Sequence, residues 1–137
     1  MMREILFRGK FGNEWKYGFL SIEPKGLVIK EPYKNESSNV WHIDADTVGQ
    51  YTDLTDKNGT KIFEGDIVKY GDTVHNVVFE QRNGTAYFGL VYSTLETLSF
   101  GYYQDLKQIE VIGNIYDNPE LLGDENNDKL WKNQINE

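Results

Sequence analysis

The chain has 137 residues, of which 39% are hydrophobic and 14% aromatic, a composition that supports a packed core and excludes a disordered chain. It contains no cysteine, which excludes a disulfide scaffold and a thiolate metal site, and its apolar runs are too short to span a membrane. The 14 basic and 22 acidic residues give a net charge of −8, which opposes binding to a phosphate backbone at long range.

Residues 1–52 are predicted to form an N-terminal β subdomain. Short apolar runs alternate there with polar positions and are separated by turn residues, as is typical of strands. The first two strands are predicted to form a hairpin in which Trp15, Tyr17 and Phe19 share one face, where we expect them to join the core. The predicted segments are strands at 5–9, 14–19, 27–30, 40–43 and 47–51 and a polar loop at 34–39.

Residues 53–122 are predicted to form a second subdomain, a small SH3-like barrel. Closely spaced β-prone runs are joined there by Gly-Asp and Asn-Gly pairs, which favour tight turns. A short helix is predicted at 118–122, because Asn118 precedes Pro119. The predicted strands lie at 66–70, 74–80, 85–92 and 108–116. The fold class is therefore mainly β with little helix.

Residues 123–137 form a polar tail that includes Leu130, Trp131 and Ile135. We expect this tail either to fray or to form a weak amphipathic helix. The three apolar residues are unusual in a free tail, so they are predicted to dock on their own domain or on a second copy. The second arrangement would give a symmetric homo-oligomer.

A polar stretch around Gly59 resembles a calcium-binding loop. In the register of such a loop, however, two essential ligand positions fall on Leu54 and Gly65. We therefore interpret Asp56 and Asn58 as turn residues that bond to their own backbone, with Gly59 at positive φ. No metal ion or cofactor is expected.

Glu64 and Asp66 share a strand face and could act as a general acid and base. No companion cation or histidine is evident, and Gly65 is more simply interpreted as a bend that starts a strand. His42 and His75 are far apart in the sequence, and each is expected on the polar face of a strand. The surface to test first for binding comprises Asp56, Asn58, Glu64, Asp66 and Tyr70, and the predicted structural turn residues are Gly59, Gly65, Gly113 and Pro119.

Charge is unevenly distributed along the chain. Residues 1–34 hold seven basic and four acidic residues, a net charge of +3, so residues 35–137 carry −11. Because alternate strand residues face opposite sides, the basic residues need not share one surface. We expect them to be solvated side chains along strand edges.

Three segments together resemble the YopX family of small proteins encoded by phages and prophages of Gram-positive bacteria. They are Phe7–Lys10 with Glu14–Leu20, then Thr47–Thr52 with Asp56–Gly59 and Ile62–Val68, and finally Glu110–Leu122. Asp53 stands where the family more often has glycine. The resemblance implies a mainly β fold with an SH3-like barrel in the second half, a phage or prophage origin and a place in the host cytoplasm. It implies no activity and no catalytic residues.

The favoured hypothesis is a non-enzymatic accessory module of a phage. It would bind a macromolecule, a protein rather than a nucleic acid, and could form a homo-oligomer. A second hypothesis is an acidic mimic of the DNA phosphate array that inhibits a host DNA-binding protein, motivated by the −11 charge of residues 35–137. The third is a hydrolase that uses Glu64 and Asp66.

Overall fold

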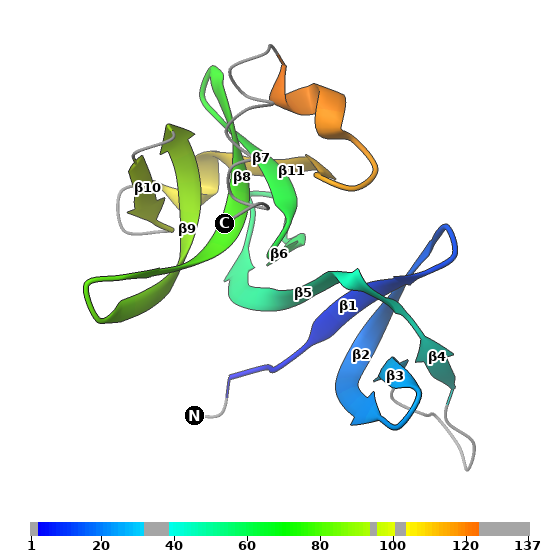
Figure 1. Ribbon diagram of the computed structural model, residues 1–137. Coiled ribbons are helices and arrows are strands. Elements are labelled where there is room, and N and C mark those ends of the chain that lie inside the picture. Colours follow the sequence, from blue (N-terminus) through cyan, green and yellow to red (C-terminus); the bar gives the residue numbers. More distant parts are fainter. Residues whose placement is uncertain (1–2, 32–38, 94–95, 101–103, 124–137) are drawn as a thin grey trace. The chain divides into compact units, whose positions relative to one another are not determined.

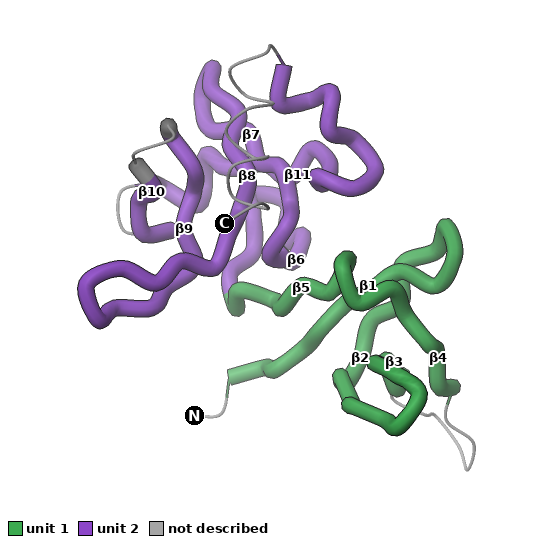
Figure 2. The backbone as a smooth tube through the Cα atoms, viewed as in Figure 1, with its two compact units in different colours: residues 1–53 green, residues 54–137 purple. Residues whose placement is uncertain are grey.

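The computed structural model describes residues 3–31, 39–93, 96–100 and 104–123, and these residues fold almost entirely into β-strands (Figure 1). The chain divides into two compact units, Met1–Asp53 and Leu54–Glu137 (Figure 2). No helix among the described residues is long and apolar enough to cross a membrane.

The N-terminal unit is an antiparallel sheet with the strand order β4-β3-β2-β1-β5. Its strands are β1 (Phe7–Phe11), β2 (Glu14–Glu23), β3 (Gly26–Lys30), β4 (Val40–His42) and β5 (Asp44–Thr55). The predicted first hairpin is confirmed, because β1 and β2 pair from Phe7↔Gly18 to Phe11↔Glu14. Val28 and Ile29 are fully buried in this unit.

One expectation for this hairpin was wrong. Tyr17 and Phe19 are 43% and 57% exposed, so the face that they share is not a closed core. The neighbouring Trp15 is half-buried and lies under the guanidinium of Arg8, whose carbon is 4.5 Å from the ring centroid. The long strand β2 therefore buries its aromatic residues only at its N-terminal end, where β1 supplies a cation to cover the ring.

The C-terminal unit contains a second antiparallel sheet, with the strand order β10-β9-β8-β7-β11. Its strands are β7 (Asp66–Tyr70), β8 (Thr73–Arg82), β9 (Thr85–Ser93), β10 (Glu96–Ser99) and β11 (Ile109–Asn114). The short strand β6 (Lys61–Phe63) also belongs to this unit and follows β5 in the first sheet's order. The buried core consists of Ile62, Val68, Val77, Leu90, Phe100 and Ile109.

The predicted SH3-like barrel is not confirmed, because this sheet is open. Its edge strands β10 and β11 do not pair with each other among the described residues. The described chain approaches β11 through a short 3-10 turn, η1 (Leu106–Gln108), rather than through a strand that would close the ring. The prediction of a mainly β fold is confirmed, and the structure forms two antiparallel sheets.

The predicted C-terminal helix is only a 3-10 turn, η2 (Pro119–Leu122). Pro119 occupies its first position, which suits a helix start, but Gly123 at φ 89° ends the turn after four residues. Gly113 lies close to this turn, and a Cβ there would be 2.7 Å from the side-chain oxygen of Asn118. The residues predicted to dock or to mediate oligomers, Leu130, Trp131 and Ile135, lie outside the described residues, as does most of the predicted loop at 34–39.

Candidate functional site

The Asp56 carboxylate is a structural cap rather than an open ligand. Its Oδ1 accepts hydrogen bonds from the backbone N–H groups of Asn58 (2.8 Å) and Thr60 (2.9 Å), and its Oδ2 accepts one from Val111 (2.9 Å). Burial alone would raise the pKa of Asp56, but these donors, Val111 first, together hold that pKa below its usual value. Asp56 therefore bonds to its own turn as interpreted, and Gly59 has the predicted positive φ of 81°.

Asp66 has a similar structural position. It is 2% exposed, and its Oδ2 accepts a 2.7 Å hydrogen bond from the backbone N–H of Phe63. Between it and the half-buried Glu64, Gly65 has φ 93°, a conformation that glycine adopts without strain. Gly65 also donates its N–H to the carbonyl of Val77 (2.8 Å). These contacts shape the start of β7, and they leave the Asp66 carboxylate buried.

The remaining members of the predicted binding surface do not complete a common site. Asn58 is exposed in its turn, whereas Tyr70 packs against the buried core at the far end of β7. Within the described residues, no group of three histidine, aspartate or glutamate side chains could hold a metal ion. The residues predicted as one patch therefore contribute mainly to local backbone structure.

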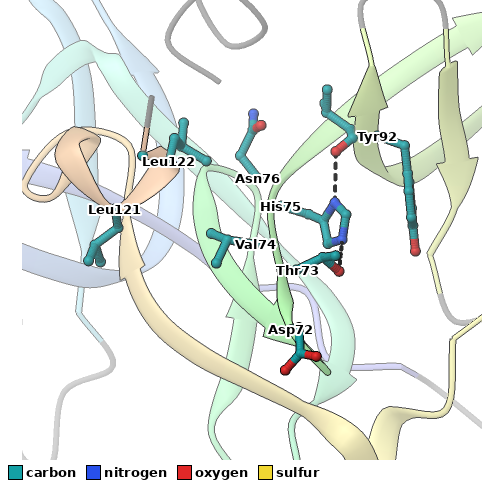
Figure 3. Close-up of a pocket in the computed structure, with 10 residues that line it drawn as sticks. Asp72, Thr73, Val74, His75, Asn76, Tyr92, Leu121 and Leu122 are labelled. Carbon is teal, nitrogen blue, oxygen red and sulfur yellow. Dashed lines mark hydrogen bonds between the residues drawn. The ribbon is translucent and has the colours of Figure 1, made fainter. Parts of the chain in front are cut away.

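A pocket of about 390 Å³ lies elsewhere in the C-terminal unit (Figure 3). This volume falls within the range of about 300–1,000 Å³ that is typical of ligand pockets. Its walls come from the start of β8, the end of β9 and the turn η2. The lining residues are Asp72, Thr73, Val74, His75, Asn76, Val91, Tyr92, Leu121, Leu122 and Gly123.

The pocket forms where β8 leaves β9. Residues 73–76 of β8 pair with β7, and the register with β9 begins only at Val77↔Leu90 and continues to Arg82↔Thr85. The β9 side of residues 73–76 therefore has no partner strand among the described residues. The turn η2 contacts β8, and its Leu121 and Leu122 supply an apolar wall of this opening.

His75 is buried at this opening, with an exposed fraction of 5%, so the expectation that it lies on a polar face was wrong. Its Nε2 is 2.7 Å from the hydroxyl of Thr73, and its Nδ1 is 3.0 Å from the carbonyl of Val91. The ring centroids of His75 and Tyr92 are 4.2 Å apart, with the two planes tilted by 35°. Burial lowers the pKa of His75, and the hydrogen bond to Val91 offsets this only in part. The imidazole is therefore neutral at neutral pH.

Asn76 supplies the polar group of the pocket. It is 3% exposed, and Figure 3 shows its amide directed away from the strand into the space between η2 and the end of β9. The amide is not one of the fully buried side-chain groups that lack a hydrogen-bond partner among the described residues. A side-chain amide can both donate and accept hydrogen bonds, so this group is suited to a ligand or to ordered water in the pocket.

Sequence reasoning missed Thr73, His75, Asn76 and Tyr92 as site residues. One signal was available for His75, because strand alternation puts it on the same face as Val77, which belongs to the core. No comparable signal existed for Asn76, since its pocket depends on η2, which follows it by more than forty positions in the sequence.

The described residues define a two-unit, mainly β protein with a pocket in its C-terminal unit. The family model described as YopX protein matches residues 8–123, and the chain therefore belongs to the YopX family. It is similar to the crystal structure of protein EF1440 from Enterococcus faecalis, with 24% identity, coverage of 88% of this chain and 99% of that one, and a TM-score of 0.48. No curated protein matches.

Proposed function

We propose that this YopX-family protein is a non-enzymatic binding module that holds a segment of another protein in the pocket of its C-terminal unit. The observation that carries the proposal is the Asn76 amide, which is 3% exposed and directed into the pocket. The resemblance to phage-encoded proteins supports the further proposal that it acts as an accessory protein of a phage or prophage inside the bacterial cell.

The Thr73–His75 pair could be taken for a nucleophile and its general base, because the hydroxyl and Nε2 are 2.7 Å apart. Two features favour binding instead. The Thr73 hydroxyl is also 2.9 Å from the carbonyl of Tyr70, which competes for its single proton. The group that faces Nδ1 is the backbone carbonyl of Val91, which stabilises an imidazolium less than a carboxylate would.

A protein partner is favoured over a nucleic acid by the charge of this unit. Residues 54–137 contain fourteen acidic and seven basic residues, so a phosphate backbone would be repelled. The DNA-mimic alternative needs acidic groups on the surface, and two of these carboxylates, Asp56 and Asp66, are buried caps. The hydrolase alternative is also weakened, since the Asp66 carboxylate is buried and accepts a hydrogen bond from the backbone N–H of Phe63.

The test is affinity capture from a lysate of the host bacterium, with and without nuclease. We compare the wild-type protein with Asn76→Leu, which replaces the pocket amide with an apolar side chain of similar size. Gln81→Leu is the matched control, because Gln81 is an exposed amide on the same strand, β8.

We expect one or more proteins to be retained by the wild type and by Gln81→Leu, regardless of nuclease. Retention by Asn76→Leu should fall about tenfold, which corresponds to ~1.4 kcal/mol of binding free energy. Equal retention by Asn76→Leu, or loss on nuclease treatment, would refute the proposal. Circular dichroism of each variant separates a binding defect from unfolding.

A further inference from the structure

We propose that the segment bound at this pocket is an extended peptide, which adds as a strand to the open edge of β8 and inserts one apolar side chain against η2. This inference rests on the proposed function and names the chemistry of the partner. The occupant is an extended segment of another protein, with an apolar anchor and a neighbouring lysine or arginine.

The backbone of β8 is oriented for such an addition. The carbonyl of Val77 accepts a hydrogen bond from Gly65, on the β7 side of the strand. Successive residues of an antiparallel strand direct their N–H and C=O groups to opposite sides, so Val74 directs its groups away from β7. Pairing with β9 ends at Val77↔Leu90, and Val74 therefore faces the open side. A peptide laid there would receive main-chain hydrogen bonds from this edge.

The Asn76 amide adds a second element of backbone recognition. A side-chain amide carries one acceptor oxygen and two N–H donors, which complement the N–H and C=O of a peptide unit. Because Asn76 is 3% exposed, a hydrogen bond formed there is shielded from water, and leaving the amide unpaired would be unfavourable. An extended peptide can satisfy this group and the Val74 edge together.

The walls and the rim of the pocket define the side chains that it accepts. Val74, Leu121 and Leu122 form an apolar surface, which suits a branched aliphatic side chain. Asp72 lies at one end, and no lysine or arginine among the described residues lines the pocket. A basic residue beside the apolar anchor would therefore be favoured over an acidic one.

The experiment selects random heptapeptides on the immobilised full-length protein, with Asn76→Leu and Gln81→Leu in parallel. We expect the wild type and Gln81→Leu to enrich peptides with β-branched residues at alternate positions, one apolar anchor and an adjacent lysine or arginine. Asn76→Leu should bind the selected peptides about tenfold more weakly. A selected set that is acidic, or equally bound by Asn76→Leu, would overturn the inference.

A second measurement tests strand addition itself. Each backbone amide of the best selected peptide is N-methylated in turn, and its affinity is measured. An added strand bonds to its neighbour through alternate residues, so methylation should weaken binding about tenfold at every second position and little at the positions between. A uniform effect, or none, would show that the backbone is not recognised and would overturn the inference.

The outcomes separate this inference from the proposed function. If lysate capture depends on Asn76 but no peptide is enriched, the partner is bound as a folded surface, and only the extended-peptide inference fails. If neither depends on Asn76, both fail. If peptides are enriched only on a Trp131→Ser variant of the full chain, the chain's own C-terminal residues compete for the groove, and the inference of an external partner is overturned.

Discussion

Asp56 Oδ2 accepts a 2.9 Å hydrogen bond from the backbone N–H of Val111, a residue 55 positions further along the chain. The same carboxylate holds the turn at Asn58 and Thr60 through its other oxygen. One side chain thus joins a local turn to β11, the edge strand of the second sheet. Neighbouring backbone reinforces the junction, because Lys57 donates its N–H to the carbonyl of Ile109 at 2.9 Å.

Asp56→Ala is expected to destabilise the protein by about 2–3 kcal/mol, since three backbone donors in partly buried hydrogen bonds lose a charged acceptor. Urea denaturation measures this free energy of unfolding. Asp46→Ala, at an exposed position, is the control and should change it by less than about 0.5 kcal/mol. Equal effects of the two substitutions would contradict the structural role of Asp56.

Gly59→Val should destabilise by about 1–2 kcal/mol, because φ is 81° there and a β-branched residue is strained in that region. Gly59→Asn is the informative comparison, since asparagine tolerates the left-handed conformation and should cost less. No atom lies within 4 Å of the position that a Cβ would occupy, so steric collision cannot explain a difference. A valine variant as stable as the asparagine variant would argue against backbone strain.

Lowering the pH should destabilise the protein partly through His75. Burial puts its folded-state pKa below the ordinary value of 6.5, so the unfolded chain binds a proton first as the pH falls. This contribution is fully present above about pH 6.5 and is lost progressively below it. Unfolding free energies measured between pH 7.5 and 5 should show a shallower pH dependence for His75→Asn. An unchanged pH dependence in His75→Asn would contradict this role of His75.

Calcium at millimolar concentration, or EDTA, is expected to leave the melting temperature unchanged. Both carboxylate oxygens of Asp56 already accept backbone hydrogen bonds, and Leu54 and Gly65 stand where calcium ligands would be needed. Differential scanning fluorimetry checks this. Because tight binding of an ion stabilises a folded protein by mass action, a rise of several degrees would reveal a site that these residues do not account for.

Strands β7, β8 and β9 were predictable because local residues determine them, whereas the short strands β6 and β10 were not predicted. Gly71, Asn83 and Gly84 have positive φ values in the tight turns where the sequence places them, and β7, β8 and β9 follow with nearly the predicted bounds. Closure of a barrel was not predictable in this way. It depends on whether β10 and β11 meet, and no local pattern encodes that contact.

In the candidate site, too, the features set by local sequence were predictable and those set by long-range contacts were not. The role of Asp56 as a turn residue could be predicted, since two of the hydrogen bonds that its carboxylate accepts come from Asn58 and Thr60 in the same turn. The pocket around Asn76 could not be predicted from local sequence. It forms because β8 pairs first with β7 and then with β9, and because η2 lies beside the residues where the pairing changes. These are contacts between segments far apart in the sequence.

The exchange of partners along β8 also affects solubility. A strand that pairs first on one side and then on the other leaves two free edges, and free edges promote aggregation unless charge blocks them. The free edge along residues 77–82 carries the ion pair between Glu80 and Arg82, at 3.3 Å, and this charge opposes pairing with another chain. The earlier edge, from Thr73 to Asn76, has no charged side chain of this kind. One free edge of β8 is therefore protected by charge against pairing with another strand, and the other is not.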